Sequence, residues 1–377
     1  MVPTIERPAE RRRQNERSNS DRLEQYRQVP PISLPPSAVR RRWRTTEKRE
    51  QERSMSLLAE TVRILLNGLQ TGAIYVLLAI GLSIILGTLK FVNFAHGALY
   101  VVGLYVGLLV SQETTFSQGQ LAEFGFGTLG LDMGFLAALI IVPIIVFVLG
   151  MAMERFVARP FYDRPDTDQI LLTFGLAIVV QQALRVLFGG NSQSFAQPAW
   201  ASGAVQLPLV GGFPQWRLWV IVITAVLVVL VYALIEFTDF GLTVRAGTQD
   251  SEMVQLLGIK ITRPYIAVFG IGAALAGVAG VVGGPLTVVN PTVGTDVLVP
   301  AFLTVVIGGL GSIRGAVLGG LILGITQSFL IQWSLVIPAL GINYGLAPWS
   351  QVGIYAIAAI ILLVRPQGLL GSEVDIS

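Results

Sequence analysis

Long apolar stretches separated by short polar segments run from about residue 64 to the C-terminus. The stretches 135–153, 218–235 and 351–364 contain no charged residue. Each comes close to the roughly 20 residues that cross the hydrocarbon core of a bilayer as a helix. The pattern therefore predicts an all-α, polytopic membrane protein. The expected spans are 64–88, 94–110, 135–153, 169–188, 218–236, 265–284, 297–311, 315–333 and 348–364.

Basic residues mark alternate connections between these spans from residue 111 onward. The segments 154–168 and 238–263 carry three Lys or Arg each. Because the cytoplasmic loops of membrane proteins hold an excess of Lys and Arg, we expect both segments on the cytoplasmic side. The connections without Lys or Arg, expected outside, are 111–133, 189–215, 285–296 and 334–347.

The region 57–110 conflicts with a cytoplasmic N-terminus. An external loop at 111–133 then requires an odd number of crossings, yet two apolar runs are visible. Three explanations stay open: a re-entrant or broken element, two short helices within the first run, or an N-terminus on the outside. We favour a broken element, because Gly87, Asn93 and Gly97 interrupt this stretch.

The first 55 residues differ in composition from the rest. They contain 14 Lys or Arg and 8 Asp or Glu, whereas residues 56–377 contain 12 and 15. A segment with so little apolar surface cannot offset the entropy of ordering, so we expect disorder over 1–55. We expect this extension to lie in the cytoplasm, attracted to anionic membrane lipid and binding no nucleic acid. A membrane domain over 56–371 and a tail at 372–377 complete the predicted organisation, and a translation start near Met55 is an open alternative.

The composition of the chain excludes several classes of protein and of binding site. Only 13% of the residues are charged, about half the share of a soluble domain. The chain has no cysteine and one histidine, His96, which excludes a disulfide framework, a thiolate metal site and a multi-histidine centre. It also has no GxxxxGK[ST] loop for a nucleoside triphosphate. The sequence predicts no metal, no cofactor and no catalytic residue.

Small residues recur at helical spacing in the expected span 265–284. Gly272, Ala276, Gly280 and Gly284 fall four apart and so share one helix face. Small residues at this spacing let helix backbones approach closely in lipid, and we interpret the four as helix-packing residues. The same spacing of small residues recurs in a later span at Gly315, Gly319, Gly320 and Gly324.

Two segments, 86–103 and 307–320, interrupt the helical pattern with a glycine-bearing kink. Non-helical backbone at membrane depth must be buried in protein or line a cavity. Matching interrupted segments in two halves of a transporter point to inverted repeats around a central site. We expect Asn93 to cap the helix that follows. We interpret His96, which has no carboxylate within a helical turn, as a hydrogen-bonding packing residue rather than a proton relay.

The polar connection 238–263 contains a short amphipathic pattern from Val244 to Leu257, and Gly258 suits the position after the helix. Such a helix either lies on the membrane surface or docks into a groove on a cytoplasmic partner.

This loop, the NFAHG motif at 93–97 and the GGLGSIRGAVLGG motif at 308–320 together resemble the branched-chain amino acid permease family of ATP-driven importers. The resemblance runs from about Leu65 to Gly371. It implies a type II-like ABC importer permease, a bundle of about eight to ten transmembrane helices in a prokaryotic inner or plasma membrane. It also implies a transport subunit without enzymatic activity, in which ATP hydrolysis belongs to separate subunits.

The resemblance implies partners and site residues as well. The partners are a homologous second permease subunit, two cytoplasmic ATPase subunits and an extracytoplasmic solute-binding protein; whether the two permeases are identical stays open. A coupling helix over 244–259 is expected to meet the ATPase through Arg245, Ala246, Asp250, Glu252, Val254, Leu257 and Gly258. The residues expected near the translocation path are Asn93, Phe94, His96, Gly97, Gly308, Gly309 and Gly311.

Two departures leave the solute open. Ala98 follows NFAHG where many family members carry an acid, and Arg314 stands where proline is common. The implied solute is a branched-chain or other small aliphatic amino acid, moved by alternating access; urea or a short amide is an alternative. An ion-coupled carrier is a further alternative, but it needs a buried titratable group that the pattern lacks.

Overall fold

The computed structural model describes residues 36–337 and 342–371. The chain divides between Leu58 and Ala59 into two units. The second unit, from Ala59 onward, contains the helical bundle.

Nine apolar helices in the described residues correspond one to one to the nine predicted spans, which confirms the polytopic helical bundle. Seven are long and apolar enough to cross a membrane, whereas α3 and α11 have 16 residues each. Their bounds are α2 (Pro36–Leu89), α3 (His96–Ser111), α5 (Phe135–Met153), α6 (Asp166–Phe188), α7 (Gln215–Phe237), α10 (Thr262–Gly283), α11 (Val293–Gly308), α12 (Ile313–Gln332) and α13 (Ser350–Val364).

The connections hold short elements. The strands form two-stranded antiparallel ribbons that pair β1 with β2, β3 with β6, β4 with β5 and β7 with β8. Strand bounds are β1 (Thr114–Thr115), β2 (Thr128–Leu129), β3 (Gln193–Ser194), β4 (Ala204–Leu207), β5 (Gly211–Pro214), β6 (Val288–Val289), β7 (Ser334–Ile337) and β8 (Ile342–Gly345). The short helices are α4 (Gln120–Glu123), η1 (Glu154–Ala158), η2 (Arg159–Phe161), η3 (Ala199–Ala201), α8 (Asp239–Gln249), α9 (Ser251–Leu256), η4 (Gly284–Leu286) and η6 (Ala347–Trp349).

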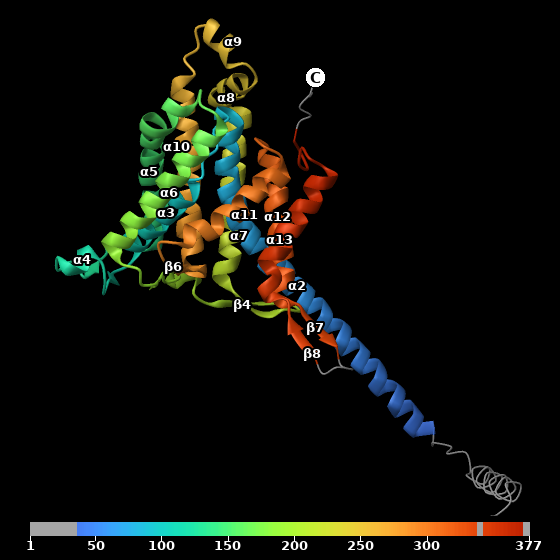
Figure 1. Cartoon of the computed structure of the whole chain (residues 1–377). Coiled ribbons are helices and arrows are strands. Elements are labelled where there is room, and N and C mark those ends of the chain that lie inside the picture. The colour runs from blue at the N-terminus through green and yellow to red at the C-terminus, as the bar shows by residue number, and fades with distance from the viewer. Residues whose placement is uncertain (1–35, 338–341, 372–377) are drawn as a thin grey trace, which may run out of the picture. The chain divides into compact units, whose positions relative to one another are not determined.

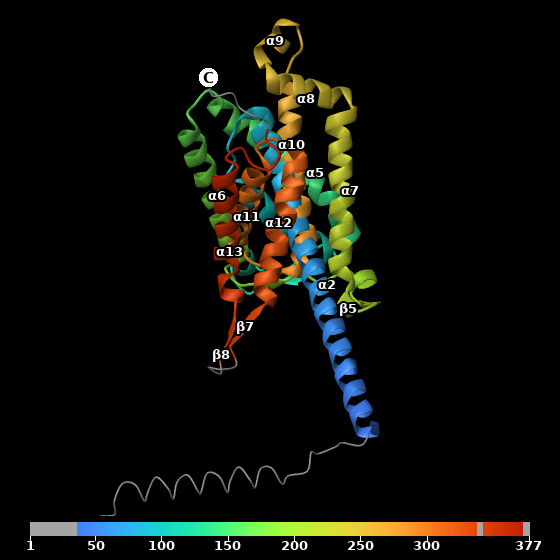
Figure 2. The ribbon, with the colours of Figure 1, turned by 90° about the vertical axis from the view of Figure 1, so that its right-hand side faces the viewer.

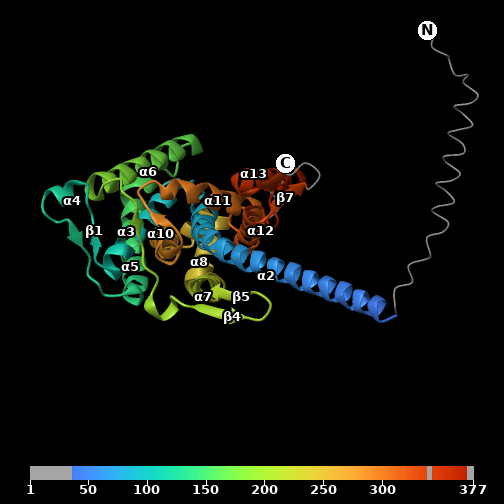
Figure 3. The same cartoon turned by 90° about the horizontal axis from the view of Figure 1, so that it is seen from below.

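Helix α10 forms the centre of the bundle, packed against α3 and α5, while α11 packs against α12 and α3. Nearly every residue of α10 from Val268 onward is buried. Seen from below, α3 and α10 lie inside, with α6 and α13 toward the periphery (Figure 3). On α6 only Gln169 and Thr173 are buried among the described residues. The large apolar side chains exposed along α5, α6 and α7 are those expected of a lipid-facing surface.

The polar connections alternate between the two ends of the bundle. Helices α8 and α9 project from one end, and β4, β5, β7 and β8 lie at the other (Figures 1 and 2). The connection between α5 and α6 shares the α8 end, where Arg159 Nη2 donates to Thr262 Oγ1 at 3.1 Å. The two basic connections are therefore on the same end, as the charge pattern predicts.

The favoured interpretation of 57–110 as containing a broken element is wrong. Arg63 Nη2 donates to the Val210 carbonyl, between β4 and β5, at 2.8 Å, so α2 enters the bundle at the β4–β5 end. Helix α3 returns to that end, where the backbone N–H of Ala196 donates to Gln112 Oε1 at 2.8 Å. Two complete helices thus lie in this region.

The glycines and Asn93 that suggested a break belong to the connection 90–95 and the turns beside it. This connection is inside the bundle, with Phe91 and Ala95 fully buried. A helix that starts below the bundle surface needs fewer residues to reach the far end, and the 16 residues of α3 cover about 24 Å.

The expected disorder also needs correction for part of its range. From Pro36 to Met55 the chain is helical, as the first part of α2, while residues 1–35 lie outside the described residues. The segment contains six Arg and three Glu, which are good helix formers. It is also continuous with an apolar helix that supplies the nucleus, so adding turns is easier than starting a helix.

Candidate translocation path and coupling site

The NFAHG segment begins with a side-chain turn. Asn93 Oδ1 accepts a hydrogen bond from the backbone N–H of Ala95 at 3.0 Å. Helix α3 then starts at His96 with Ala95 as its N-cap, which makes no side-chain capping bond. Asn93 therefore shapes the turn before the helix instead of capping it.

Two side chains of α6 hold this connection in place. Gln169 Oε1 accepts from the backbone N–H of Val92 at 3.1 Å, and Thr173 Oγ1 accepts from that of Phe94 at 3.0 Å. Both side chains are buried, and they satisfy backbone groups that a non-helical segment leaves without helical partners. Sequence reasoning missed them, although two polar residues one turn apart on an apolar helix are a usable signal.

His96 is fully buried against α2. Its Nε2 lies 3.1 Å from the carbonyl oxygen of Leu78, and its Nδ1 has no hydrogen-bond partner among the described residues. A Cβ on Gly81 would lie 3.1 Å from the imidazole Cε1, so the ring fills a close contact between helices. This placement fits the packing role.

The first turns of α3 and α11 touch through Gly97 and Gly294. A Cβ on Gly97 would lie 2.5 Å from the Gly294 carbonyl oxygen, and one on Gly294 would lie 2.4 Å from that of Gly97. Only glycine fits on either side of this contact. Beside it the rings of Phe94 and Phe302 lie 5.5 Å apart.

The structure brings the two interrupted segments together at one point. Gly311, with φ +80°, ends the turn after α11, and a Cβ on Gly87 would lie 2.5 Å from its Cα. Gly308 and Gly309 contact the C-terminal segment and not the NFAHG connection. The backbone N–H of Leu370 donates to the Gly308 carbonyl at 3.0 Å. The C-terminal segment 368–371 therefore lies against the end of α11, apart from Asn93 and His96. Nothing in the sequence pattern predicted this contact between the C-terminal segment and α11.

The expected packing residues of α10 face its neighbours. Ala276 is fully buried. A Cβ on Gly272 would lie 2.7 Å from the Gly81 carbonyl oxygen, and one on Gly280 would lie 2.4 Å from that of Tyr100. Gly284 follows the helix and abuts the ring of Phe195. Three of these positions thus line helix contacts, and the fourth lies in the turn beyond.

The expected single helix at 244–257 is wrong: the connection forms two helices that meet at Asp250. Thr238 Oγ1 accepts from the Gly241 N–H at 3.1 Å and begins α8. Asp250 Oδ1 accepts from the Met253 N–H at 2.8 Å and begins α9. Because Asp250 caps a new helix, its own backbone leaves the helical conformation and the axis bends there.

Helix α9 carries an exposed apolar tip. Met253, Leu256 and Leu257 are 54%, 76% and 72% exposed, whereas Val254 is buried. Gly258, with φ +81°, ends the helix: its N–H donates to Gln255 and the Ile259 N–H donates to Val254. These two bonds form the C-terminal glycine motif. Of the expected coupling residues, Val254 faces inward, and Leu256 is an exposed residue that the pattern did not single out.

The rest of the expected coupling set lies on α8 and around the bend. Arg245 pairs with Glu236 at 2.5 Å and so links α8 to α7. Ala246 is half-buried, and Asp250 and Glu252 are exposed.

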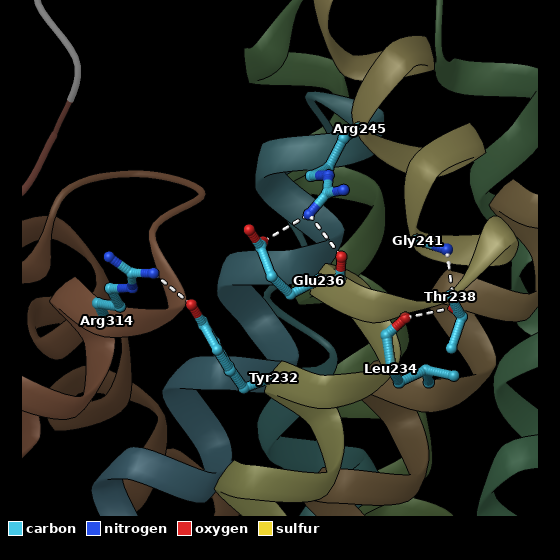
Figure 4. Close-up of polar contacts among 7 residues, drawn as sticks. All are labelled: Tyr232, Leu234, Glu236, Thr238, Gly241, Arg245 and Arg314. Atoms are coloured by element: carbon cyan, nitrogen blue, oxygen red, sulfur yellow. Dashed lines mark hydrogen bonds and ion pairs between the residues drawn. The ribbon is translucent and has the colours of Figure 1, made fainter.

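A second arginine meets α7 close by. Arg314, in the first turn of α12, donates to the hydroxyl of Tyr232, and its guanidinium lies 5.2 Å from the centroid of that ring. Figure 4 shows both arginines reaching the last turns of α7.

A buried carboxyl lies near this end of the bundle. Glu154 is 1% exposed, and its Oε1 accepts from the Tyr162 hydroxyl at 2.9 Å. Its Oε2 has no hydrogen-bond partner among the described residues. Burial, together with the Glu154 carboxylate, raises the pKa of Tyr162, so its hydroxyl stays a donor. In the same described part of the chain, no group of three or more His, Cys, Asp or Glu could hold a metal ion.

Comparison with known proteins gives a consistent result. A family model described as "Branched-chain amino acid transport system / permease component" matches residues 64–364. The chain is 31% identical over 312 residues to the high-affinity branched-chain amino acid transport system permease protein LivH of Escherichia coli (strain K12), covering 81% of this chain and 94% of LivH. It is 32% identical over 316 residues to the corresponding permease protein BraD of Pseudomonas aeruginosa, with the same coverage.

A partial match is also found. The probable branched-chain amino acid transport permease protein LivM of Methanocaldococcus jannaschii is 30% identical over 156 residues, which covers 40% of this chain and 45% of LivM. No solved structure gives a significant match.

Proposed function

Because the chain belongs to the branched-chain amino acid permease family, we propose that it is the membrane-spanning subunit of an ATP-driven importer of branched-chain amino acids. The observation that carries this proposal is the end-to-end match: the aligned part covers 94% of two relatives named as such permeases. The chain has no P-loop of its own, so the proposal assigns ATP hydrolysis to separate subunits.

The proposed partners are a second permease, two ATPase subunits and an extracytoplasmic solute-binding protein. The partial match to LivM supports a second permease of related sequence. The exposed apolar tip of α9 supports a docking contact, because three large apolar side chains on so short a helix favour burial against another protein.

The proposed orientation puts α9 in the cytoplasm of a prokaryotic cell, with β4 and β5 outside. The basic residues around α8 and α9 support this orientation. Since α2 enters the bundle at the β4–β5 end, Ala59 then lies on the outer side. This favours the alternative in which the chain enters the bundle from the outer side, over entry from the cytoplasm.

In the proposed mechanism, movement of the ATPases on nucleotide binding pushes α9, and the push reaches α7 through α8. The bundle then exchanges between inward- and outward-open packings, and each nucleotide state biases this population. The NFAHG connection and the glycine turn, which meet at Gly87 and Gly311, are the proposed moving parts of the path.

Uptake by intact cells tests the function. Deleting the gene should abolish ATP-dependent uptake of radiolabelled leucine and valine, and the wild-type gene should restore it. Restored uptake of urea or a short amide alone would favour the alternative solute, and uptake that an ionophore stops while ATP is present would favour an ion-coupled carrier.

Single cysteines test the orientation without background, because the chain has none of its own. Lys260→Cys, in the exposed connection after α9, should react with a membrane-impermeant maleimide only after lysis, and Leu209→Cys, in the β4–β5 turn, should react in intact cells. The reverse pattern would refute the orientation.

A further inference from the structure

A pocket lies between the middle of α6 and the first turns of α3 and α11. Its volume is about 90 Å³. Phe94 and Gly97 of the NFAHG motif belong to its wall, next to the contact between Gly97 and Gly294. Most of the remaining wall is apolar and includes Ala98, Val101, Phe174, Ala177, Leu184 and Leu298.

The size of the pocket limits what it can hold. An apolar cavity of about 150 Å³ holds a benzene molecule. A pocket of about 90 Å³ therefore suits a smaller group, such as the side chain of leucine or valine. A lipid acyl chain needs a long groove instead.

Two polar side chains, Gln181 and Thr295, also line the pocket. Within the described residues neither side chain makes a hydrogen bond. Thr295 is exposed and Gln181 is half-buried, so both side chains are free to bond to a ligand in the pocket. An amino acid presents an ammonium and a carboxylate beside its side chain, and an amide and a hydroxyl can bond to both.

Helix α6 forms the outer wall and is held at its two ends. Gln169 and Thr173 bind the 90–95 connection at one end. At the other, the ring of Phe188 lies 5.1 Å from that of Tyr105 and 5.0 Å from that of Phe116. Between Thr173 and Phe188 the helix has no buried side chain. The pocket thus has a fixed inner wall on α3 and α11 and a less tightly packed outer wall.

We propose that this pocket receives the aliphatic side chain of the transported amino acid, while Gln181 and Thr295 face its polar groups. The proposal rests on the proposed function and deepens it, because it assigns discrimination among aliphatic solutes to named residues of the permease.

Pocket filling tests the proposal in intact cells that carry the complete importer, with the variant gene in its natural place. Ala177→Phe should lower leucine uptake relative to alanine uptake by about tenfold, the scale of a change in apolar fit within a binding pocket. Val179→Phe is the matched control, since Val179 lies two residues further along α6, is 63% exposed and does not line the pocket. The binding protein is the same throughout, so its own preference cancels in the comparison with wild type.

Two further variants separate the effects. Leu184→Ala enlarges the pocket and should raise phenylalanine uptake relative to leucine. Gln181→Leu should lower uptake of leucine, valine and alanine alike, because all three share the polar groups.

An unchanged leucine-to-alanine ratio in Ala177→Phe at normal membrane abundance would overturn the proposal, as would an equal change in Val179→Phe. Either result would point to lipid or a side chain of the second permease as occupant. If Ala177→Phe fails to reach the membrane, the ratio of phenylalanine to leucine uptake in Leu184→Ala decides instead. An unchanged ratio would then overturn the proposal. A wild-type importer that takes up no aliphatic amino acid would instead refute the proposed function itself.

Discussion

Arg314 at the start of α12 donates a hydrogen bond to the hydroxyl of Tyr232 on α7, and its guanidinium lies 5.2 Å from the centroid of the Tyr232 ring. One turn further along α7, Glu236 pairs with Arg245 of α8. The last turns of α7 therefore connect the helix that leads to the exposed tip with the helix that follows the glycine turn. This contact joins the proposed coupling site to the proposed path.

Arg314→Ala should slow solute uptake by up to about fivefold, the scale of an exposed cation–π contact, and should barely change thermal unfolding. Tyr232→Phe, which keeps the ring and removes the hydroxyl, should show a smaller loss. Uptake and ATPase activity of the assembled importer measure the effect. Arg365→Ala, at the exposed end of α13, is the control; equal losses there would contradict a specific link.

Leu256→Asp and Leu257→Asp should each abolish co-purification of the ATPase subunits while leaving the bundle folded. Both side chains are more than 70% exposed, so a charge costs little in the isolated permease but cannot be buried at an interface. Leu256→Met, which keeps the apolar surface, should retain binding. Association that survives both Asp variants would remove α9 from the coupling role.

Gly97→Ala should reduce the stability of the protein by about 1–3 kcal/mol, the usual cost of overpacking, because the new methyl meets the Gly294 carbonyl. Gly175→Ala is the matched control within a helix. Apart from its own helix backbone and its chain neighbours, no atom lies within 4 Å of a Cβ at that position, so the change should be neutral or slightly stabilising. Thermal unfolding in detergent compares the two, and similar midpoints would show that the contact is looser than described.

Tyr162→Phe should destabilise the protein by about 1–3 kcal/mol, because it leaves the buried Glu154 carboxyl without its donor. The double variant with Glu154→Leu should recover much of that loss, since no buried acceptor then remains. Tyr355→Phe, at an exposed tyrosine of α13, should have no effect. A double variant as unstable as the sum of its parts would show that the two residues act separately.

Apolar runs predicted the nine helices of the bundle because lipid imposes the same length and composition on every span. The first residue of a helix was less predictable where polar residues begin it. Asp166 and Asp168 occupy the first turn of α6, which begins three residues before the expected span. Acidic side chains stabilise a helix N-terminus, so this shift has a local cause.

The bend at Asp250 was also accessible in principle, since Asp is a preferred N-cap and the amphipathic pattern passed over it. Contacts between segments far apart in the chain could not be predicted from the sequence. Gly97 and Gly294 meet across nearly two hundred residues, and neither has a local pattern that names its partner. The same holds for Gln169 with Val92 and for the C-terminal segment on α11.

The two-ended attachment of α6 determines how that helix can deform. A helix held at both ends cannot swing outward as a rigid body, but it can bend between Thr173 and Phe188, where no α6 side chain is buried. If the pocket next to NFAHG widens, α6 would then bend without breaking the contacts at either end. Those intact contacts would return the helix to its original shape once the solute has left.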